Sequence, residues 1–233
     1  NVSNLIETLP IEYKNKIEVI RFDIDGPCKL HFLNKIVIPY MKENCNKYFI
    51  HLDGDEYINL NNNYSNINEL LIDFKYPDIL CLNWLLFGSN NKEYNDNKYN
   101  CLIPTYTKCD NNLSSHFKAL INVKILDNDT TFINPHQLFN KNKKLKYTNI
   151  CNHEFIFNNK DKYYDLFNNL LPNISFQDSK AYLNHYTIQS KEDYNFRKVN
   201  RNRDDISKNR SNDENIFNNY NNIYNFNLEN YYN

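Results

Sequence analysis

Acidic side chains gather directly after a short apolar run between residues 48 and 58. Asp53, Asp55 and Glu56 follow Tyr48–Leu52, a run that is typical of a buried strand. Carboxylates this close repel one another unless a cation lies between them, and a divalent metal that prefers oxygen ligands, Mn²⁺ or Mg²⁺, is the simplest candidate. Gly54 lets the backbone approach a ligand. The pattern predicts a metal and phosphate site, although a solvated acidic turn would leave the same pattern.

A second acidic turn is expected upstream. The run Ile17–Phe22 is typical of a strand, and it delivers Asp23 and Asp25 to a turn closed by the Gly-Pro pair at 26–27. A helix is expected over 29–44, because apolar residues recur there at helical spacing. Strand, helix and strand form a βαβ unit, whose strands are parallel and buried. Both acidic turns are then expected at the carboxyl edge of the sheet, where open α/β sheets bind ligands.

Histidine and basic residues late in the chain are further candidates. His185 follows an apolar approach and could complete the protein ligands of the metal, while a partly buried histidine satisfied by backbone is the alternative. His136 is a weaker candidate of the same kind. A helix is expected over about 191–200, and it carries a group of basic residues: Arg197, Lys198, Arg201 and Arg203. These residues could approach a diphosphate, and a solvated helix face is the alternative explanation.

The composition is that of an AT-rich genome, such as a giant virus or an AT-rich protist. Asn, Lys, Ile, Tyr and Phe are in excess, while the chain has only 3 glycines and 1 methionine. Each glycine follows an apolar, strand-like run, where positive φ or close backbone approach is expected. Gly88 ends the run that begins at Trp84, the only tryptophan. Ordinary turns are the alternative use of these glycines.

Charge, cysteines and hydropathy narrow the class of protein. A net charge of −1 gives no general case for binding nucleic acid or membranes, and no apolar run approaches the length of a membrane span. The six cysteines include no Cys-x-x-Cys pair, which argues against a zinc knuckle and favours free thiols in a reducing compartment over a Cys101–Cys109 disulfide. We expect a cytoplasmic protein, in a host cytoplasm or virion if viral. The missing signal peptide and initiator methionine suggest an excised domain.

The remaining pattern predicts one α/β domain over residues 1–210, followed by an aromatic and Asn-rich tail or helix over 211–233. Its central sheet is expected to be mostly parallel and flanked by helices. The segment 90–112 is polar and is expected to be a surface loop. Further helices are expected over 67–74 and 161–170, and further strands over 78–85, 117–123, 132–139 and 182–186.

An apolar strand that ends in Asp-x-Asp-Gly also suggests a phosphatase of the haloacid-dehalogenase type. Asp23 would then be the nucleophile and Asp25 the acid. Pro27 replaces the usual small hydroxylated residue, and a later paired-acid motif is missing because Asn59 stands where a partner aspartate is needed. This function is kept as an alternative.

Five motifs in order resemble glycosyltransferases of the nucleotide-diphospho-sugar type, in the group related to families 2 and 92. The group has Asp-x-Asp-Glu-(Phe/Tyr) after a strand, a Trp strand ending in Phe-Gly-Ser, a His-Phe-Lys strand, a Pro-His segment and a final His-Tyr-x-x-x-Ser-x-Glu-(Phe/Tyr). The corresponding segments here are 53–57, 84–89, 116–118, 135–136 and 185–194. The resemblance spans nearly the whole chain.

The resemblance implies a GT-A fold, which is Rossmann-like, and the transfer of a sugar from a nucleotide donor, a UDP-sugar, to a glycan or protein acceptor. It places Mn²⁺ or Mg²⁺ on Asp53 and Asp55, with His185 as a third ligand. Glu56 and His136 are assigned to acid and base roles on the acceptor side. The expected nucleotide-sugar contacts are Asp23, Lys29, Asp53, Trp84 and Lys118.

One departure from the group concerns the start of the chain. Enzymes of this group open with a strand that precedes a segment like 1–3 and carries part of the nucleotide pocket, and the sequence lacks it. A carbohydrate-binding relic without catalysis is therefore a third possibility.

Overall fold

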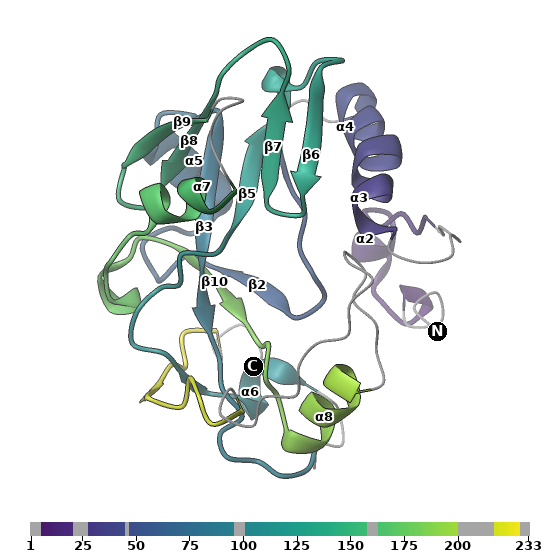
Figure 1. Cartoon of the computed structure of the whole chain (residues 1–233). Helices are drawn as coiled ribbons and strands as arrows, with labels where there is room; N and C mark the ends of the chain where they lie inside the picture. Colours follow the sequence, from purple (N-terminus) through teal and green to yellow (C-terminus); the bar gives the residue numbers. More distant parts are fainter. Residues whose placement is uncertain are drawn as a thin grey trace.

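The computed structural model describes residues 6–20, 28–44, 47–95, 101–157, 163–199 and 217–228. Within these ranges, seven strands form one curled sheet (Figure 1). Its strands are β1 (Tyr48–Ile50), β2 (Glu56–Asn59), β3 (Ile79–Leu86), β5 (Phe117–Asn122), β8 (Leu145–Asn149), β9 (Glu154–Phe157) and β10 (Tyr182–His185).

The sheet is mixed, and most of its pairings are antiparallel. Its main path runs β1-β5-β3-β10-β2, and β8 pairs with both β3 and β9. Only the pairings of β3 with β8 and with β10 are parallel. The other four pairings, β1 with β5, β3 with β5, β2 with β10 and β8 with β9, are antiparallel. The α/β class is confirmed, but the expected mostly parallel, Rossmann-like sheet is not.

The difference arises at the start of the chain. Residues 17–20 form no strand, and residues 21–27, which include Asp23 and Asp25, lie outside the described residues. Among the described residues, β1 pairs with β5, with Phe49 opposite Ile121. A parallel partner of β1 would require a crossover helix, whereas an antiparallel partner does not. The local apolar pattern of the strand is the same in the parallel and the antiparallel arrangement, so it does not reveal which one forms.

Apolar packing covers both faces of the sheet. Ile79 and Cys81 belong to a core with residues of the helix over 29–44 and of α7 (Tyr163–Leu170). Leu80 and Leu82, which point to the opposite face, belong to a second core with residues of α5 (Ile67–Asp73). This two-sided burial explains why β3 is a nearly continuous apolar run.

The predicted helix over 29–44 is confirmed and contains a wider turn. It consists of α3 (Lys29–Phe32), a π-helical turn η1 (Leu33–Val37) and α4 (Ile38–Asn44). Pro39 cannot donate the usual helical hydrogen bond, and the π-turn ends two residues before it, at Val37.

A hairpin lies beside this helix in Figure 1. It is formed by β6 (Thr130–Asn134) and β7 (Gln137–Asn140). The Asn34 amide donates to the Phe132 carbonyl at 2.9 Å and accepts from the Phe132 N–H at 2.7 Å. These two bonds fix the helix, and with it Lys29 at its start, against the β6–β7 hairpin.

The segment 90–112 is not the simple surface loop that was predicted. It contains α6 (Leu102–Thr105) and β4 (Lys108–Cys109), and Tyr106 and Cys109 are buried. Its partner is the C-terminal strand β11 (Ile223–Tyr224). The described part of the tail, 217–228, therefore packs on the body of the protein.

Gly88 has a packing role in this arrangement. A Cβ atom there would lie 2.5 Å from the Asn221 side chain and 2.6 Å from the Tyr220 carbonyl oxygen. Phe217 of the same C-terminal segment contacts Tyr194 of α8 (Lys191–Val199). The C-terminal segment is thus held by the end of β3 and by α8.

The other described elements are short: α2 (Ile11–Lys14), η2 (Val123–Ile125) and η3 (Phe176–Asp178). No disulfide joins the cysteines of the described ranges, Cys101 and Cys109 included. In the same ranges, no helix combines the length and apolar character needed to cross a membrane.

Candidate active site

Asp53 lies between two lysines at the end of β1. One carboxylate oxygen pairs with the Lys29 ammonium at the start of α3, and the other lies 2.8 Å from the Lys118 ammonium on β5. Burial would raise the pKa of Asp53, but Lys118 and Lys29 outweigh it and hold the pKa below its usual range. Three predicted site residues are thus brought into direct contact.

Glu56 is buried beside this group, and one of its carboxylate oxygens is already engaged. Its Oε2 atom accepts from the Asp53 N–H at 2.8 Å and lies 3.4 Å from the Lys118 ammonium. Burial raises the pKa of Glu56 to about 7, although Lys118 acts in the opposite direction. A carboxyl group that titrates near neutral pH can accept or donate a proton there.

Asp55 and His185, two of the predicted metal ligands, lie side by side. Strands β2 and β10 pair with Glu56 opposite His185, and the His185 Nε2 atom is 3.9 Å from Asp55 Oδ1. The other oxygen of Asp55 lies 2.8 Å from the Arg197 guanidinium on α8. Burial lowers the pKa of His185 to about 4, with Asp55 opposing the shift, so its imidazole is neutral at pH 7.

Trp84 is surrounded by three histidine rings. His116 stacks on it with ring centroids 5.3 Å apart and an interplanar angle of 9°, while His136 and His185 lie at 5.2 and 4.2 Å. The His136 Nδ1–H donates to the Phe117 carbonyl at 2.8 Å, which leaves its Nε2 lone pair available. Burial and then Lys118 lower the pKa of His136 to about 3, so it is a weak base.

Several buried polar atoms of this cluster have no hydrogen-bond partner in the described part of the chain: His51 Nδ1, Glu56 Oε1, Trp84 Nε1 and His185 Nδ1. Each such atom costs about 1–3 kcal/mol unless water or a ligand satisfies it. Unsatisfied polar atoms next to shifted pKa values are typical of a functional site. We call the following residues the active-site cluster: Lys29, His51, Asp53, Asp55, Glu56, Trp84, His116, Lys118, His136, His185 and Arg197.

The metal prediction fits this cluster in part. Asp55 and His185 present an oxygen and a nitrogen donor, which suits a metal held by few protein ligands. The remaining predicted ligand, Asp53, directs its oxygens to Lys29 and Lys118 instead. No group of three or more His, Cys, Asp or Glu side chains able to hold a metal occurs among the described residues. The metal stays a prediction.

Sequence reasoning left three members of the cluster without a specific role. His51 belongs to the expected strand over 48–52. His116 belongs to the His-Phe-Lys motif, which supports only the resemblance to glycosyltransferases. Arg197 was grouped with basic residues that could approach a diphosphate, yet it contacts Asp55. No local sequence pattern identifies Arg197 as the partner of Asp55, because the two residues are 142 positions apart.

The phosphatase alternative cannot be placed on this geometry, because Asp23 and Asp25 lie outside the described residues. The side chains of Lys198, Arg201 and Arg203 lie outside them as well. The resemblance to glycosyltransferases stays a prediction from motifs. Comparisons with protein-family models, curated proteins and solved structures find no match to this chain.

Proposed function

We propose that the chain transfers a sugar from a nucleotide-diphosphate sugar, such as a UDP-sugar, to a glycan or protein acceptor. The observation that carries the proposal is the pair of Asp55 and His185 beside Trp84. The five motifs predicted this pair as metal ligands, although the residues are 130 positions apart. A carboxylate next to a neutral imidazole is a suitable donor set for Mn²⁺ or Mg²⁺.

Cationic side chains around the pair suit a diphosphate leaving group. Lys29 and Arg197 are partly exposed, with 19% and 21% of their side chains accessible, while Lys118 is buried behind them. Ammonium and guanidinium groups offset the charge that builds on a departing diphosphate. When bound to Asp55 and His185, the metal would supply further charge stabilisation at the same phosphates.

The transfer step requires a base for the acceptor. As the acceptor hydroxyl oxygen bonds to the anomeric carbon, the bond from that carbon to the phosphate oxygen breaks and its electron pair leaves with the diphosphate. The hydroxyl proton then passes to Glu56, whose pKa of about 7 suits that role, or to the weaker base His136. His116 stacks on the ring of Trp84, so this predicted nucleotide-sugar contact does not present that face to the donor.

The test uses Mn²⁺ and UDP with the full chain. We expect the two together to raise the melting temperature, and a screen of UDP-sugars to show release of UDP. Asp55→Asn should abolish both responses, while Asp178→Asn, at an exposed position outside the cluster, should leave both intact. An Asp55→Asn variant that keeps both responses would sink the proposal.

Assays of sugar binding and of aryl-phosphate hydrolysis, run beside the UDP-release screen, separate the transferase from the two alternative functions. A carbohydrate-binding relic would bind sugar without releasing UDP. A phosphatase would hydrolyse an aryl phosphate with Mg²⁺, lose that activity in Asp23→Asn and keep it in Asp55→Asn.

A further inference from the structure

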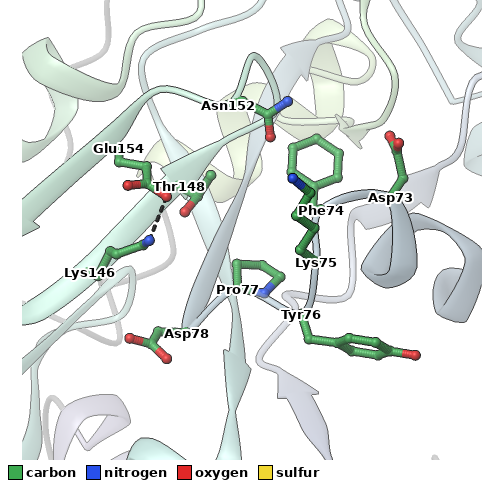
Figure 2. Close-up of a pocket in the computed structure, with 10 residues that line it drawn as sticks. All are labelled: Asp73, Phe74, Lys75, Tyr76, Pro77, Asp78, Lys146, Thr148, Asn152 and Glu154. Atoms are coloured by element: carbon green, nitrogen blue, oxygen red, sulfur yellow. Dashed lines mark ion pairs between the residues drawn. The ribbon is translucent and has the colours of Figure 1, made fainter.

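A second site is suggested by a hollow of about 510 Å³ at the start of β3 (Figure 2). One wall comes from the connection between α5 and β3, with Phe74 and Pro77, and the other from the β8–β9 hairpin, with Thr148 and Glu154. Trp84 lies six residues further along β3 than Asp78, which is roughly 20 Å in an extended strand. The hollow is therefore separate from the active-site cluster.

Thr148 is the feature that points to a ligand. Its residue is only 4% exposed, it lines the hollow, and its hydroxyl oxygen has no hydrogen-bond partner among the described residues. In the sheet it lies between Leu80 of β3 and Glu154 of β9, so it is paired on both sides. A buried hydroxyl of this kind is normally satisfied by water or a ligand.

The charges around the hollow largely cancel. Lys146 and Glu154 form an ion pair at 2.6 Å, which Figure 2 marks, and Asp73 pairs with Lys180 at 2.6 Å. Asp78 and Lys75 add one charge of each sign. A strongly anionic or cationic ligand therefore has little electrostatic advantage here. The oxygen-rich lining does not form a metal site either, because no suitable group of three ligands occurs in the described part of the chain.

The two walls differ in polarity. Phe74 and Pro77 are buried apolar residues, and across the hollow from them lie Lys146, Thr148 and Glu154, as Figure 2 shows. Asn152 adds an amide at the far end of the hollow. A ligand that matches this lining has an apolar face and hydroxyl groups at its edges, and it carries no net charge.

We infer that this hollow binds a neutral saccharide, whose hydroxyl groups contact Thr148, Glu154 and Asn152 while a face of its ring packs on Pro77. Hydroxyl groups both donate and accept, so they can satisfy the Thr148 oxygen and the carboxylate in one orientation. The inference does not depend on the proposed transfer reaction.

The test uses NMR of the ¹⁵N-labelled full chain, without nucleotide, titrated with millimolar glucose, galactose, mannose, fucose or N-acetylglucosamine. At least one sugar should shift the amide signals of Thr148 and Asn152 in a saturable way. Thr148→Val, which keeps the shape and removes the hydroxyl, should weaken that binding about fivefold. Because the substitution removes an unsatisfied buried group, its melting temperature should not fall.

Two further variants complete the design. Thr131→Val makes the same change at an exposed strand position of β6 and should bind the sugar like the unaltered chain. Asp55→Asn should also bind it normally, whatever becomes of the transferase activity. The inference is overturned if no sugar shifts these signals, if Thr148→Val binds as well as the unaltered chain, if Asp55→Asn loses the binding, or if only inorganic phosphate shifts them.

Discussion

Two lysines on strands that pair with β3 lie beside carboxylates in opposite surroundings. Lys118, a member of the active-site cluster, lies opposite Leu82 of β3, has 1% of its side chain exposed and contacts Asp53 and Glu56. Lys146, at the hollow, has 41% exposed and pairs with Glu154, which is 53% exposed. Water competes with the pair of Lys146 and Glu154 but has no access to the contact between Lys118 and Glu56, whose side chains are 1% and 0% exposed, so the buried contact constrains the fold more strongly. The difference indicates that the cluster, unlike the hollow, is held in place by its own charges.

Removing the two ammonium groups tests this comparison directly. Lys118→Met should lower the free energy of unfolding by about 3–5 kcal/mol, because it leaves the buried Glu56 carboxylate without its cation, while Asp53 keeps its pair with Lys29. Lys146→Met should change it by no more than about 1 kcal/mol, because its pair is exposed. Urea unfolding at pH 7 measures both values. Equal losses in the two variants would contradict the comparison.

The two glycines Gly88 and Gly54 offer a second contrast, because a side chain at the first would overlap its neighbours and a side chain at the second would not. Gly88→Ala should cost about 1–3 kcal/mol, because the new Cβ would overlap the backbone at Tyr220. Gly54→Ala meets no atom within 4 Å and should change the free energy of unfolding by less than about 0.5 kcal/mol. The same urea titrations measure the effect. A large loss for Gly54→Ala would show that its backbone, and not ligand access, requires glycine.

Buried histidines give the cluster a pH dependence that the hollow, whose described lining has no histidine, should lack. The folded chain lowers the pKa of His136 from 6.5 to about 3, chiefly through burial, so folding favours the neutral ring. This contribution to stability is complete above pH 6.5 and is lost as the pH falls towards 3. Between pH 7 and pH 5 it should amount to roughly 1–2 kcal/mol.

His136→Asn should remove that share of the acid destabilisation, since the amide nitrogen of Asn takes the position of Nδ1 and can still donate to the Phe117 carbonyl. His153→Asn, at an exposed position, is the matched control and should keep the full pH dependence. Unfolding curves at pH 5 and pH 7 provide the measurement. If both variants behave alike, His136 is not the source of the effect.

The sequence predicted the elements better than their partners. The helix over 29–44 and the strands near 79–86, 117–122 and 182–185 follow from local apolar spacing, which survives in any arrangement that buries one face. The antiparallel pairing of β1 with β5 could not be predicted, because the direction of a neighbouring strand leaves no local pattern.

The site shows the same limit. Asp53, Asp55 and His185 were recognisable as chemistry-bearing residues because of their types and spacing. That Asp53 pairs with Lys29 and Lys118, and only Asp55 approaches His185, depends on contacts between distant segments. Lys29, Lys118 and Arg197 thus contact the carboxylates that the motifs predicted as metal ligands.

Arg197 is the cation whose removal should have the smallest effect and the most specific one. Its pair with Asp55 is intermediate between the two lysine pairs, with 21% and 16% of the side chains exposed. If the proposed metal binds Asp55, it must compete with this guanidinium. Arg197→Gln should therefore lower the Mn²⁺ concentration needed for half-maximal thermal stabilisation in the presence of UDP by about fivefold, equivalent to about 1 kcal/mol.

The control for this variant lies on the same helix. Lys191→Gln removes a more exposed pair with Glu93, at 3.6 Å, and should leave the Mn²⁺ response unchanged. A weaker response in Arg197→Gln would mean that the guanidinium contacts the diphosphate more strongly than it competes for Asp55. In that case the contribution of Arg197 to binding the diphosphate, together with Lys29, outweighs its competition with the metal, and the contrast between buried and exposed pairs would not extend to α8.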